Sequence, residues 1–196
     1  MMVKKYDQIE DKFFEEENLE LLYQLFKLKN LHRQGWLKRD IDKLEGESVA
    51  DHTFGTAMTA WVLAKHFKLD LNMEKVLKMS LVHEIGEIYA GDITPVDGVS
   101  PAEKHRRELA SIEKVFANYT NGEEFISLWK EFEEAKSDEA VFLKQIDKFE
   151  MGIQAAIYKG HDNPKMDEFI DSATKVMDSL ELQELFKKVA NREEKE

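Results

Sequence analysis

The segment LVHEIGEIYAGD, residues 81–92, combines groups that can bind a metal ion with groups that can move a proton. Within an otherwise almost wholly apolar run it holds His83, Glu84 and Glu87. At about 100° per residue of helix, these side chains fall within one arc of roughly 100° and can reach one point. A carboxylate buried beside leucine and isoleucine is costly unless a cation or a hydrogen-bond donor compensates it. The segment therefore predicts a buried polar site on a helix.

Two more polar residues interrupt apolar surfaces in other predicted helices. His52 falls in the first turns of one helix, and Asp147 lies within FLKQIDKFEM, residues 142–151. Nitrogen and carboxylate ligands suit Mn²⁺, Co²⁺, Fe²⁺ or Zn²⁺, and four of them leave positions open for water and substrate. Taken singly, each residue also has an ordinary structural explanation. A histidine on an apolar face usually has a hydrogen-bond partner, and Asp147 can pair with Lys144 one turn back.

The composition limits what such a site can serve. With 196 residues, 42% of them hydrophobic, the chain can bury a core in one domain. The absence of cysteine excludes disulfides, thiolate metal sites and cysteine nucleophiles, and it fits a reducing compartment, so we expect a cytoplasmic protein. No stretch approaches the roughly 20 apolar residues of a membrane span. A net charge of -12 argues against nucleic acid and anionic membranes, so a phosphorylated small molecule needs a local basic patch.

Apolar residues recur at three- and four-residue spacing, with only three prolines and nine glycines, so we predict an all-α chain. Asn18 is expected to cap the first helix, and Ser48 and Asp51 form a capping-box pattern. Asn72 precedes the helix that carries His83, and Gly91 is expected to end it. The helices are expected at 19–31, 52–67, 73–90, 102–119, 122–135, 137–158 and in two segments after Pro164.

Several motifs together resemble the HD-domain metal-dependent phosphohydrolases. They are ESVADH with His52, LVHEIGE with His83, GDITP with Asp92 nine residues later, and KQIDKFEM with Asp147. RQGWLKRDI, residues 33–41, and SPAEKHRRE, residues 100–108, resemble the 5′-deoxynucleotidase branch, the YfbR-like and HD-domain-containing protein 2 type. The likeness extends over residues 19 to about 160. It implies a single HD-domain helical bundle for residues 1–196, with helices at 165–190 on the core or at a dimer interface.

The resemblance assigns a role to each polar residue of these motifs. It implies a divalent cation, Mn²⁺, Co²⁺, Fe²⁺, Zn²⁺ or Mg²⁺, held by His52, His83, Glu84 and Asp147. It makes Glu87 and Asp92 the catalytic acids. The Asp that gives the family its name is Glu84 here, and we expect its extra methylene to shift the cation or tilt its coordination.

The reaction implied is hydrolysis of a deoxynucleoside 5′-monophosphate to nucleoside and phosphate. One acid accepts or orients the proton of the attacking water, and the other gives a proton to the departing sugar oxygen. Which of the two acids does which is left open. Arg33 is expected to contact the phosphate and Trp36 to stack on the base or sugar. Lys104 and Arg107 form a second basic patch, although four basic residues in a row are usually a solvated face.

Other functions fit part of the pattern. HEIGE is similar to the zinc peptidase motif HExxH, but Glu87 stands where the second zinc-binding histidine belongs. A nucleotide-sensing protein with an HD fold and little turnover is favoured by Glu84 and disfavoured by the two catalytic acids. A nucleoside triphosphate or a cyclic nucleotide is an alternative substrate. The family is commonly dimeric, so a homodimer is also expected.

Overall fold

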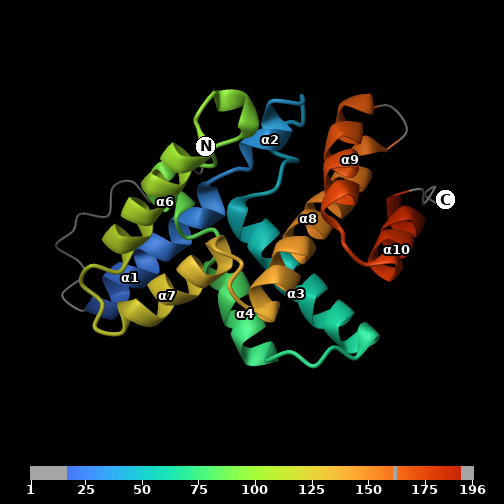
Figure 1. Cartoon of the computed structure of the whole chain (residues 1–196). Helices are drawn as coiled ribbons and strands as arrows, with labels where there is room; N and C mark the ends of the chain where they lie inside the picture. Colours follow the sequence, from blue (N-terminus) through green and yellow to red (C-terminus); the bar gives the residue numbers. More distant parts are fainter. Residues whose placement is uncertain (1–16, 161–162, 191–196) are drawn as a thin grey trace.

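The computed structural model describes residues 17–160 and 163–190, which form helices and no β-strand (Figure 1). The all-α prediction is therefore confirmed. An isolated antiparallel bridge joins His32 to Ser48. None of the described helices is long and apolar enough to cross a membrane. The elements are α1 (Glu17–Leu25), η3 (Phe26–Asn30), α2 (Gln34–Leu37), α3 (Val49–Phe67), α4 (Met73–Val82), α5 (Glu87–Ala90), η4 (Pro95–Asp97), α6 (Pro101–Val115), α7 (Gly122–Glu133), α8 (Asp138–Lys159), η5 (Pro164–Met166), α9 (Asp167–Val176) and α10 (Leu180–Ala190).

Helix α8 runs through the middle of the fold and contacts α3, α4, α7, α9 and α10 (Figure 1). Its side chains Leu143, Ile146 and Phe149 are buried in the larger of two apolar clusters. Gly152 lets the C-terminal helices approach, because a Cβ there would lie 2.4 Å from the ring of Phe186. Helices α9 and α10 thus pack on the core, which is one of the two arrangements expected for this segment.

A second apolar cluster lies among α1, α4, α6 and α7. Helix α4 contributes to both clusters: Val76 and Met79 belong to the first, while Val82 belongs to the second. The chain that follows α4, with His83 as its first residue, therefore starts where the two clusters meet. This position explains how polar side chains there come to be surrounded by core.

The helix caps read from the sequence are mostly present. Ser48 Oγ accepts a hydrogen bond from the backbone N–H of Asp51 at 3.1 Å, and the carboxylate of Asp51 accepts one in return from the N–H of Ser48 at 2.8 Å. Asn72 caps α4. The prediction for Asn18 was wrong, since this residue lies within α1 and not before it.

The helix expected over 73–90 is interrupted, which corrects the prediction of one continuous helix. Helix α4 ends at Val82, and hydrogen bonds to the third residue back take over: Glu87 N–H donates to the Glu84 carbonyl at 3.0 Å. The turn packs closely against α6, because a Cβ on Gly86 would lie 2.8 Å from the Cβ of Glu108. His83 and Glu84 therefore lie in a tight turn and not in a regular helix.

Candidate active site

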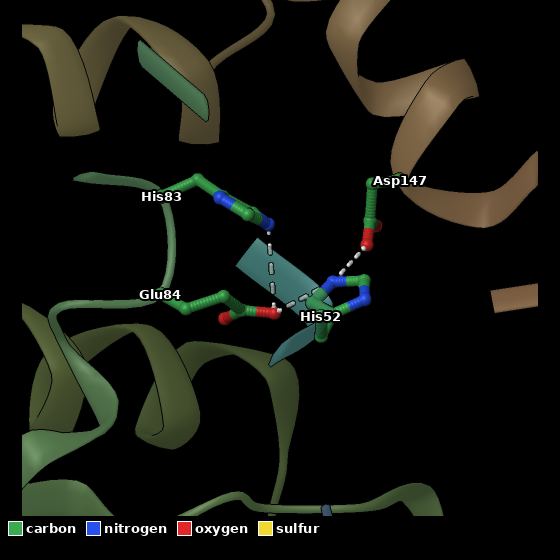
Figure 2. Close-up of side chains that lie close together, drawn as sticks. All are labelled: His52, His83, Glu84 and Asp147. Atoms are coloured by element: carbon green, nitrogen blue, oxygen red, sulfur yellow. Dashed lines mark hydrogen bonds and ion pairs between the residues drawn. The ribbon is translucent and has the colours of Figure 1, made fainter. Parts of the chain in front are cut away.

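Four side chains from three separate parts of the chain converge on one point (Figure 2). His52 comes from α3, His83 and Glu84 from the turn after α4, and Asp147 from α8. One ligand atom of each lies within 4.8 Å of the others. His52 Nε2 is 3.0 Å from Asp147 Oδ1 and 3.5 Å from Glu84 Oε1. The structure thus brings together the four residues that the sequence suggested as metal ligands.

The hydrogen bond behind His83 determines which of its nitrogens faces this point. Its Nδ1 lies 2.6 Å from the backbone carbonyl oxygen of Ser80. A carbonyl can only accept, so Nδ1 carries the proton and Nε2 presents a lone pair. This Nε2 is buried and makes no hydrogen bond, and Glu84 Oε1 is 3.8 Å away. A buried basic nitrogen beside carboxylates fits a divalent cation, and the nitrogen–oxygen donor set suits Mn²⁺, Co²⁺, Fe²⁺ or Zn²⁺.

The surroundings of His83, Glu84 and Asp147 favour the protonation states that bind a cation. Burial raises the pKa of Glu84, but the two histidines and Arg33 outweigh it and lower this pKa to about 2. Burial also raises the pKa of Asp147, yet Lys148 and the hydrogen bond with His52 hold this pKa well below its usual value. Burial also lowers the pKa of His83. Ionised carboxylates and a neutral imidazole are the forms that act as ligands.

His52 has both ring nitrogens next to carboxylates. Burial and Arg33 lower its pKa, but hydrogen bonds with Asp147 and Glu150 outweigh them and raise the pKa to about 9. A cation that binds Nε2 must therefore displace a proton, which makes its binding pH-dependent.

A cavity of about 650 Å³ opens beside the four side chains. Its volume is within the range typical of sites for small molecules. Glu87, Asp92, Arg33 and Lys104 contribute polar groups to its wall, and Lys144, Asp147 and Lys148 of α8 add further charged groups. The apolar groups of the wall come from Ile93, Pro95, Val96, Met151, Phe169 and Val176. The cavity can hold a ligand that has an anionic end and an apolar body.

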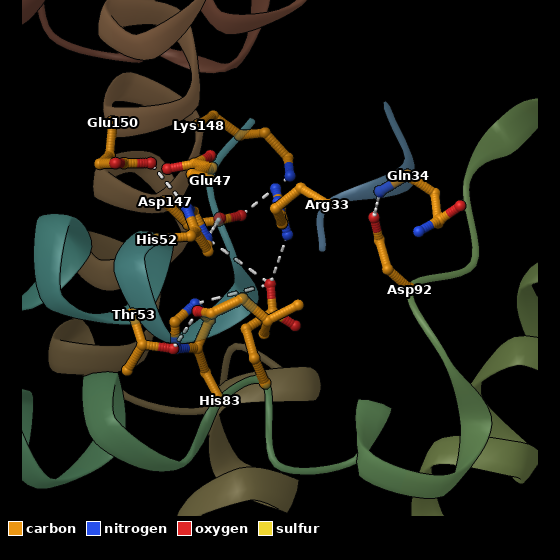
Figure 3. A network of polar contacts seen from close by, with 12 residues as sticks. Arg33, Gln34, Glu47, His52, Thr53, His83, Asp92, Asp147, Lys148 and Glu150 are labelled. Atoms are coloured by element: carbon orange, nitrogen blue, oxygen red, sulfur yellow. Dashed lines mark hydrogen bonds and ion pairs between the residues drawn. The ribbon is translucent and has the colours of Figure 1, made fainter. Parts of the chain in front are cut away.

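Glu87 and Asp92, the two acids that the resemblance suggested, both line this cavity. Glu87 is 1% exposed, and its Oε2 makes no hydrogen bond. Burial raises its pKa well above the usual value, with Glu84 and Asp92 adding to the effect. Asp92 follows Gly91, whose positive φ of 79° turns the chain after α5. Its carboxylate accepts a hydrogen bond from the backbone N–H of Gln34 (Figure 3).

Arg33 and Lys104 supply positive charge to the cavity wall. Arg33 Nη1 lies 3.0 Å from Glu84 Oε1, and both side chains are largely buried. Lys104, near the start of α6, has its Nζ 3.4 Å from Glu108 Oε1. These two residues belong to a local basic patch of the kind that an anionic ligand requires in an acidic protein, and Arg39, Lys144 and Lys148 also line the cavity.

Trp36 and Arg107, which the sequence suggested for ligand binding, do not present an exposed group to the cavity. The ring of Trp36 is 1% exposed, donates from Nε1 to Glu47 Oε1 at 2.8 Å, and packs on Phe169. It belongs to the core at the edge of the cavity and is not an exposed stacking surface. Arg107 donates from Nε to Glu103 Oε1 at 2.7 Å on the exposed side of α6, and it is not among the residues of the cavity wall.

Sequence reasoning missed two carboxylates. Glu150 Oε2 lies 2.5 Å from His52 Nδ1. Glu108 lines the cavity, and burial raises its pKa to about 7 although Lys104 opposes the shift. The spacing contained a signal for both, because Glu150 follows Asp147 by three residues and Glu108 follows Lys104 by four, which are neighbouring positions on one helix face.

Comparisons with known proteins agree on one family. The family model described as HD domain matches residues 25–189. The human 5′-deoxynucleotidase HDDC2 is 34% identical over 158 residues, which cover 79% of this chain and 75% of the human protein. The 5′-deoxynucleotidase HDDC2 of Dictyostelium discoideum is 35% identical over 158 residues, which cover 74% of this chain and 82% of that protein.

Solved structures share the fold. A protein from Pyrococcus horikoshii OT3 superposes with a TM-score of 0.72 at 32% identity, covering 88% of this chain and 96% of that one. A protein of Magnetospirillum magnetotacticum, described as a predicted metal-dependent phosphohydrolase, superposes with a TM-score of 0.71. It is 23% identical and covers 89% of this chain and 92% of that one, so it supports the fold alone.

Proposed function

The chain belongs to the HD domain family, and we propose that it is a metal-dependent phosphohydrolase that acts on deoxynucleoside 5′-monophosphates. The substrate class comes from the relatives, which are named 5′-deoxynucleotidases from mammals to yeasts. The observation that carries the proposal is that the four clustered side chains lie beside a cavity whose wall also holds the carboxyl groups of Glu87 and Asp92 and the cationic groups of Arg33 and Lys104.

His52, His83, Glu84 and Asp147 are the residues that would hold the cation. When bound, a divalent cation supplies the charge that polarises a phosphoryl group and lowers the pKa of water. Arg33 and Lys104 bind the phosphate oxygens and neutralise charge that develops as phosphorus is attacked. The guanidinium of Arg33 is the better suited to direct contact, because its planar donors match two phosphate oxygens at once.

Glu87 and Asp92 handle the protons of the reaction. One carboxyl orients or accepts the proton of the attacking water, and the other protonates the departing 5′-oxygen, which is too basic to leave as an anion. Burial raises the pKa of Glu87 well above its usual value, so this carboxyl holds a proton more readily than an exposed glutamate does. The hydrogen bond from Gln34 holds the Asp92 carboxylate on the cavity wall.

The proposal extends to the setting of the enzyme. The cation is one of Mn²⁺, Co²⁺, Fe²⁺, Zn²⁺ and Mg²⁺, the protein works in the cytoplasm, and it forms a homodimer. The lack of cysteine supports the reducing compartment. Exposed apolar side chains on α3, among them Phe54, Trp61 and Val62, support an association of chains. Metal analysis of the purified protein and light scattering test the first and last of these points.

Phosphate release from a panel of substrates tests the proposed function. The panel contains ribo- and deoxyribonucleoside monophosphates, a triphosphate and a cyclic nucleotide, each with Mn²⁺, Co²⁺, Mg²⁺ or Zn²⁺ added. We expect release from the deoxyribonucleoside monophosphates to exceed release from all other compounds. Release from the triphosphate or the cyclic nucleotide alone would assign another substrate. Metal-loaded protein that releases no phosphate would favour a nucleotide-sensing role.

A further inference from the structure

The Nδ1 side of His52 faces a buried carboxylate that the reaction described above does not use. His52 is 0% exposed, and its Nδ1 lies 2.5 Å from Oε2 of Glu150, which is 7% exposed (Figure 3). On the opposite side of the ring, Nε2 lies 3.0 Å from Asp147 Oδ1. Each ring nitrogen thus has a carboxylate at hydrogen-bond distance, while a neutral imidazole has one proton to share between them.

The position of this proton decides whether His52 can bind a metal. Nε2 is the nitrogen that points toward Glu84 and Asp147, so its lone pair must be free and the proton must lie on Nδ1. A proton held between Nε2 and Asp147 would block the ligand atom. When a cation displaces the proton from Nε2, the contact with Glu150 keeps the remaining proton on Nδ1, and a carboxylate acceptor there makes the imidazole a stronger ligand.

His83 does not have a hydrogen-bond acceptor at both ring nitrogens. Its Nδ1 donates to the Ser80 carbonyl at 2.6 Å, and its Nε2 makes no hydrogen bond. The backbone therefore fixes the tautomer of His83. For His52 the same task falls to a side chain, and Glu150 is the side chain that contacts its Nδ1. The nearby Glu47 has its own carboxylate engaged by the indole of Trp36.

A glycine in the middle of α3 makes room for this carboxylate. A Cβ on Gly55 would lie 2.3 Å from Oε1 of Glu150 and 3.0 Å from its Cδ. The backbone at Gly55 is ordinary right-handed helix, where alanine is the more stable residue. Backbone conformation thus does not call for glycine at this position. The space without a side chain is the space that Glu150 uses to reach His52.

We propose that Glu150 is a positioning residue of the metal centre: it holds His52 with the Nε2 lone pair directed at the ion, and Gly55 provides the space for it. This inference rests on the proposed function in one respect only, which is that His52 binds a metal. It does not depend on which phosphoester is hydrolysed.

The dissociation constant for Zn²⁺, measured on the full chain by competition with a chromophoric chelator, tests the proposal. Glu150→Ala and Gly55→Ala are each expected to weaken binding about 10- to 100-fold. Glu150→Gln is expected to lose less, because its amide oxygen still accepts from Nδ1–H. The double variant Gly55→Ala/Glu150→Ala is expected to bind no more weakly than Glu150→Ala, since the added methyl group then has no carboxylate to displace. Glu139→Gln, on the same helix but paired with Lys75, is the matched control.

Urea unfolding of the metal-free variants separates positioning from a general structural role. A structural role alone would lower the unfolding midpoint of Glu150→Ala and leave the Zn²⁺ affinity of its folded fraction unchanged. Zn²⁺ affinities within twofold of wild type in both Glu150→Ala and Gly55→Ala would overturn the proposal. If Glu150→Ala does not fold, Gly55→Ala carries the test. A wild-type chain that binds Zn²⁺ and releases no phosphate would overturn the proposed function, while the same pattern of affinities would still support this inference.

Discussion

Arg33 Nη1 lies 3.0 Å from Glu84 Oε1, and the same oxygen is 3.5 Å from Nε2 of His52. One carboxylate oxygen therefore connects a cationic side chain of the cavity wall to the proposed metal ligands. Glu84 takes the place of the aspartate that the HD-domain motif contains, and its longer side chain spans this distance. The proposed phosphate-binding residue and the proposed metal site are thus expected to depend on each other.

Replacing Glu84 with alanine is expected to remove the metal and to destabilise the metal-free protein. The variant loses a ligand and leaves the buried guanidinium of Arg33 without its partner, a change that costs about 3 kcal/mol in comparable buried pairs. Metal content and urea unfolding measure the two effects, with the exposed Glu74→Ala as control. Full metal occupancy in Glu84→Ala would contradict the ligand assignment.

Replacing Arg33 with lysine is expected to raise KM for a monophosphate about tenfold, and Arg33→Met more, because lysine keeps the charge but loses the planar pair of donors. Steady-state kinetics on metal-loaded enzyme measure this effect. Arg107→Met is the matched control, since Arg107 pairs with Glu103 away from the cavity. A larger change in KM for Arg107→Met than for Arg33→Met would restore the role that the sequence suggested for Arg107.

Glu87→Gln and Asp92→Asn are each expected to lower kcat about 100-fold or more and to leave metal content unchanged. Both variants keep the shape of the side chain and remove its ability to exchange a proton, which is worth about 10²- to 10⁴-fold in such reactions. Turnover and metal content are measured on the same samples. Wild-type kcat in either variant would exclude that residue from proton transfer.

The ion pair between Lys38 and Asp97 is expected to lose its contribution to stability in acid. Lys38 Nζ donates to the two carboxylate oxygens of Asp97 at 2.6 and 2.7 Å, and hydrogen bonds from Lys38 and Thr94 lower the pKa of Asp97 to about 2. The folded pKa is below the unfolded value of about 3.9, so the contribution is present above about pH 4 and disappears as the pH falls toward 2.

The stability difference between wild type and Asp97→Asn, followed by urea unfolding from pH 6 to pH 2, measures this contribution. It is expected to shrink across the acid window, while the other carboxylates titrate equally in both proteins. A difference that stays constant down to pH 2 would show that the pair does not stabilise the fold.

Gly152→Val is expected to destabilise the protein by about 1–3 kcal/mol, because the added side chain meets the Phe186 ring and the Cβ of Ala173. Gly98→Ala is the comparison variant, because a Cβ on Gly98 has nothing within 4 Å and meets no neighbour. Its only cost is backbone strain, since Gly98 has a φ of 69°. Thermal unfolding reports both variants. Unchanged stability in Gly152→Val would show that α9 and α10 do not pack tightly on α8.

The sequence was most informative about features that depend on local pattern, such as helix periodicity and helix caps. Helix periodicity predicted an all-α fold, and the caps at Ser48 and Asn72 identified two helix starts correctly. The interruption of the helix after Val82 was not predicted, because the apolar spacing continues through it, and the contact that the turn makes through Gly86 with α6 does not show in that spacing.

In the candidate site, too, some features could be predicted from the local sequence and others depend on contacts between distant residues. His52, His83, Glu84 and Asp147 were suggested by their types and settings, since each places a polar group on an apolar surface. The burial of Trp36 and the pairing of Arg107 depend on which side of an element meets the core. Residue type and spacing do not contain that information.

The most direct test of the account is phosphate release from a deoxynucleoside monophosphate as metal-free protein is titrated with its cation. We predict that the rate rises in proportion to bound metal, levels off at one ion per chain, and stays at background in Glu87→Gln at the same occupancy. Release that does not depend on bound metal, or an equal rate in Glu87→Gln, would contradict the account.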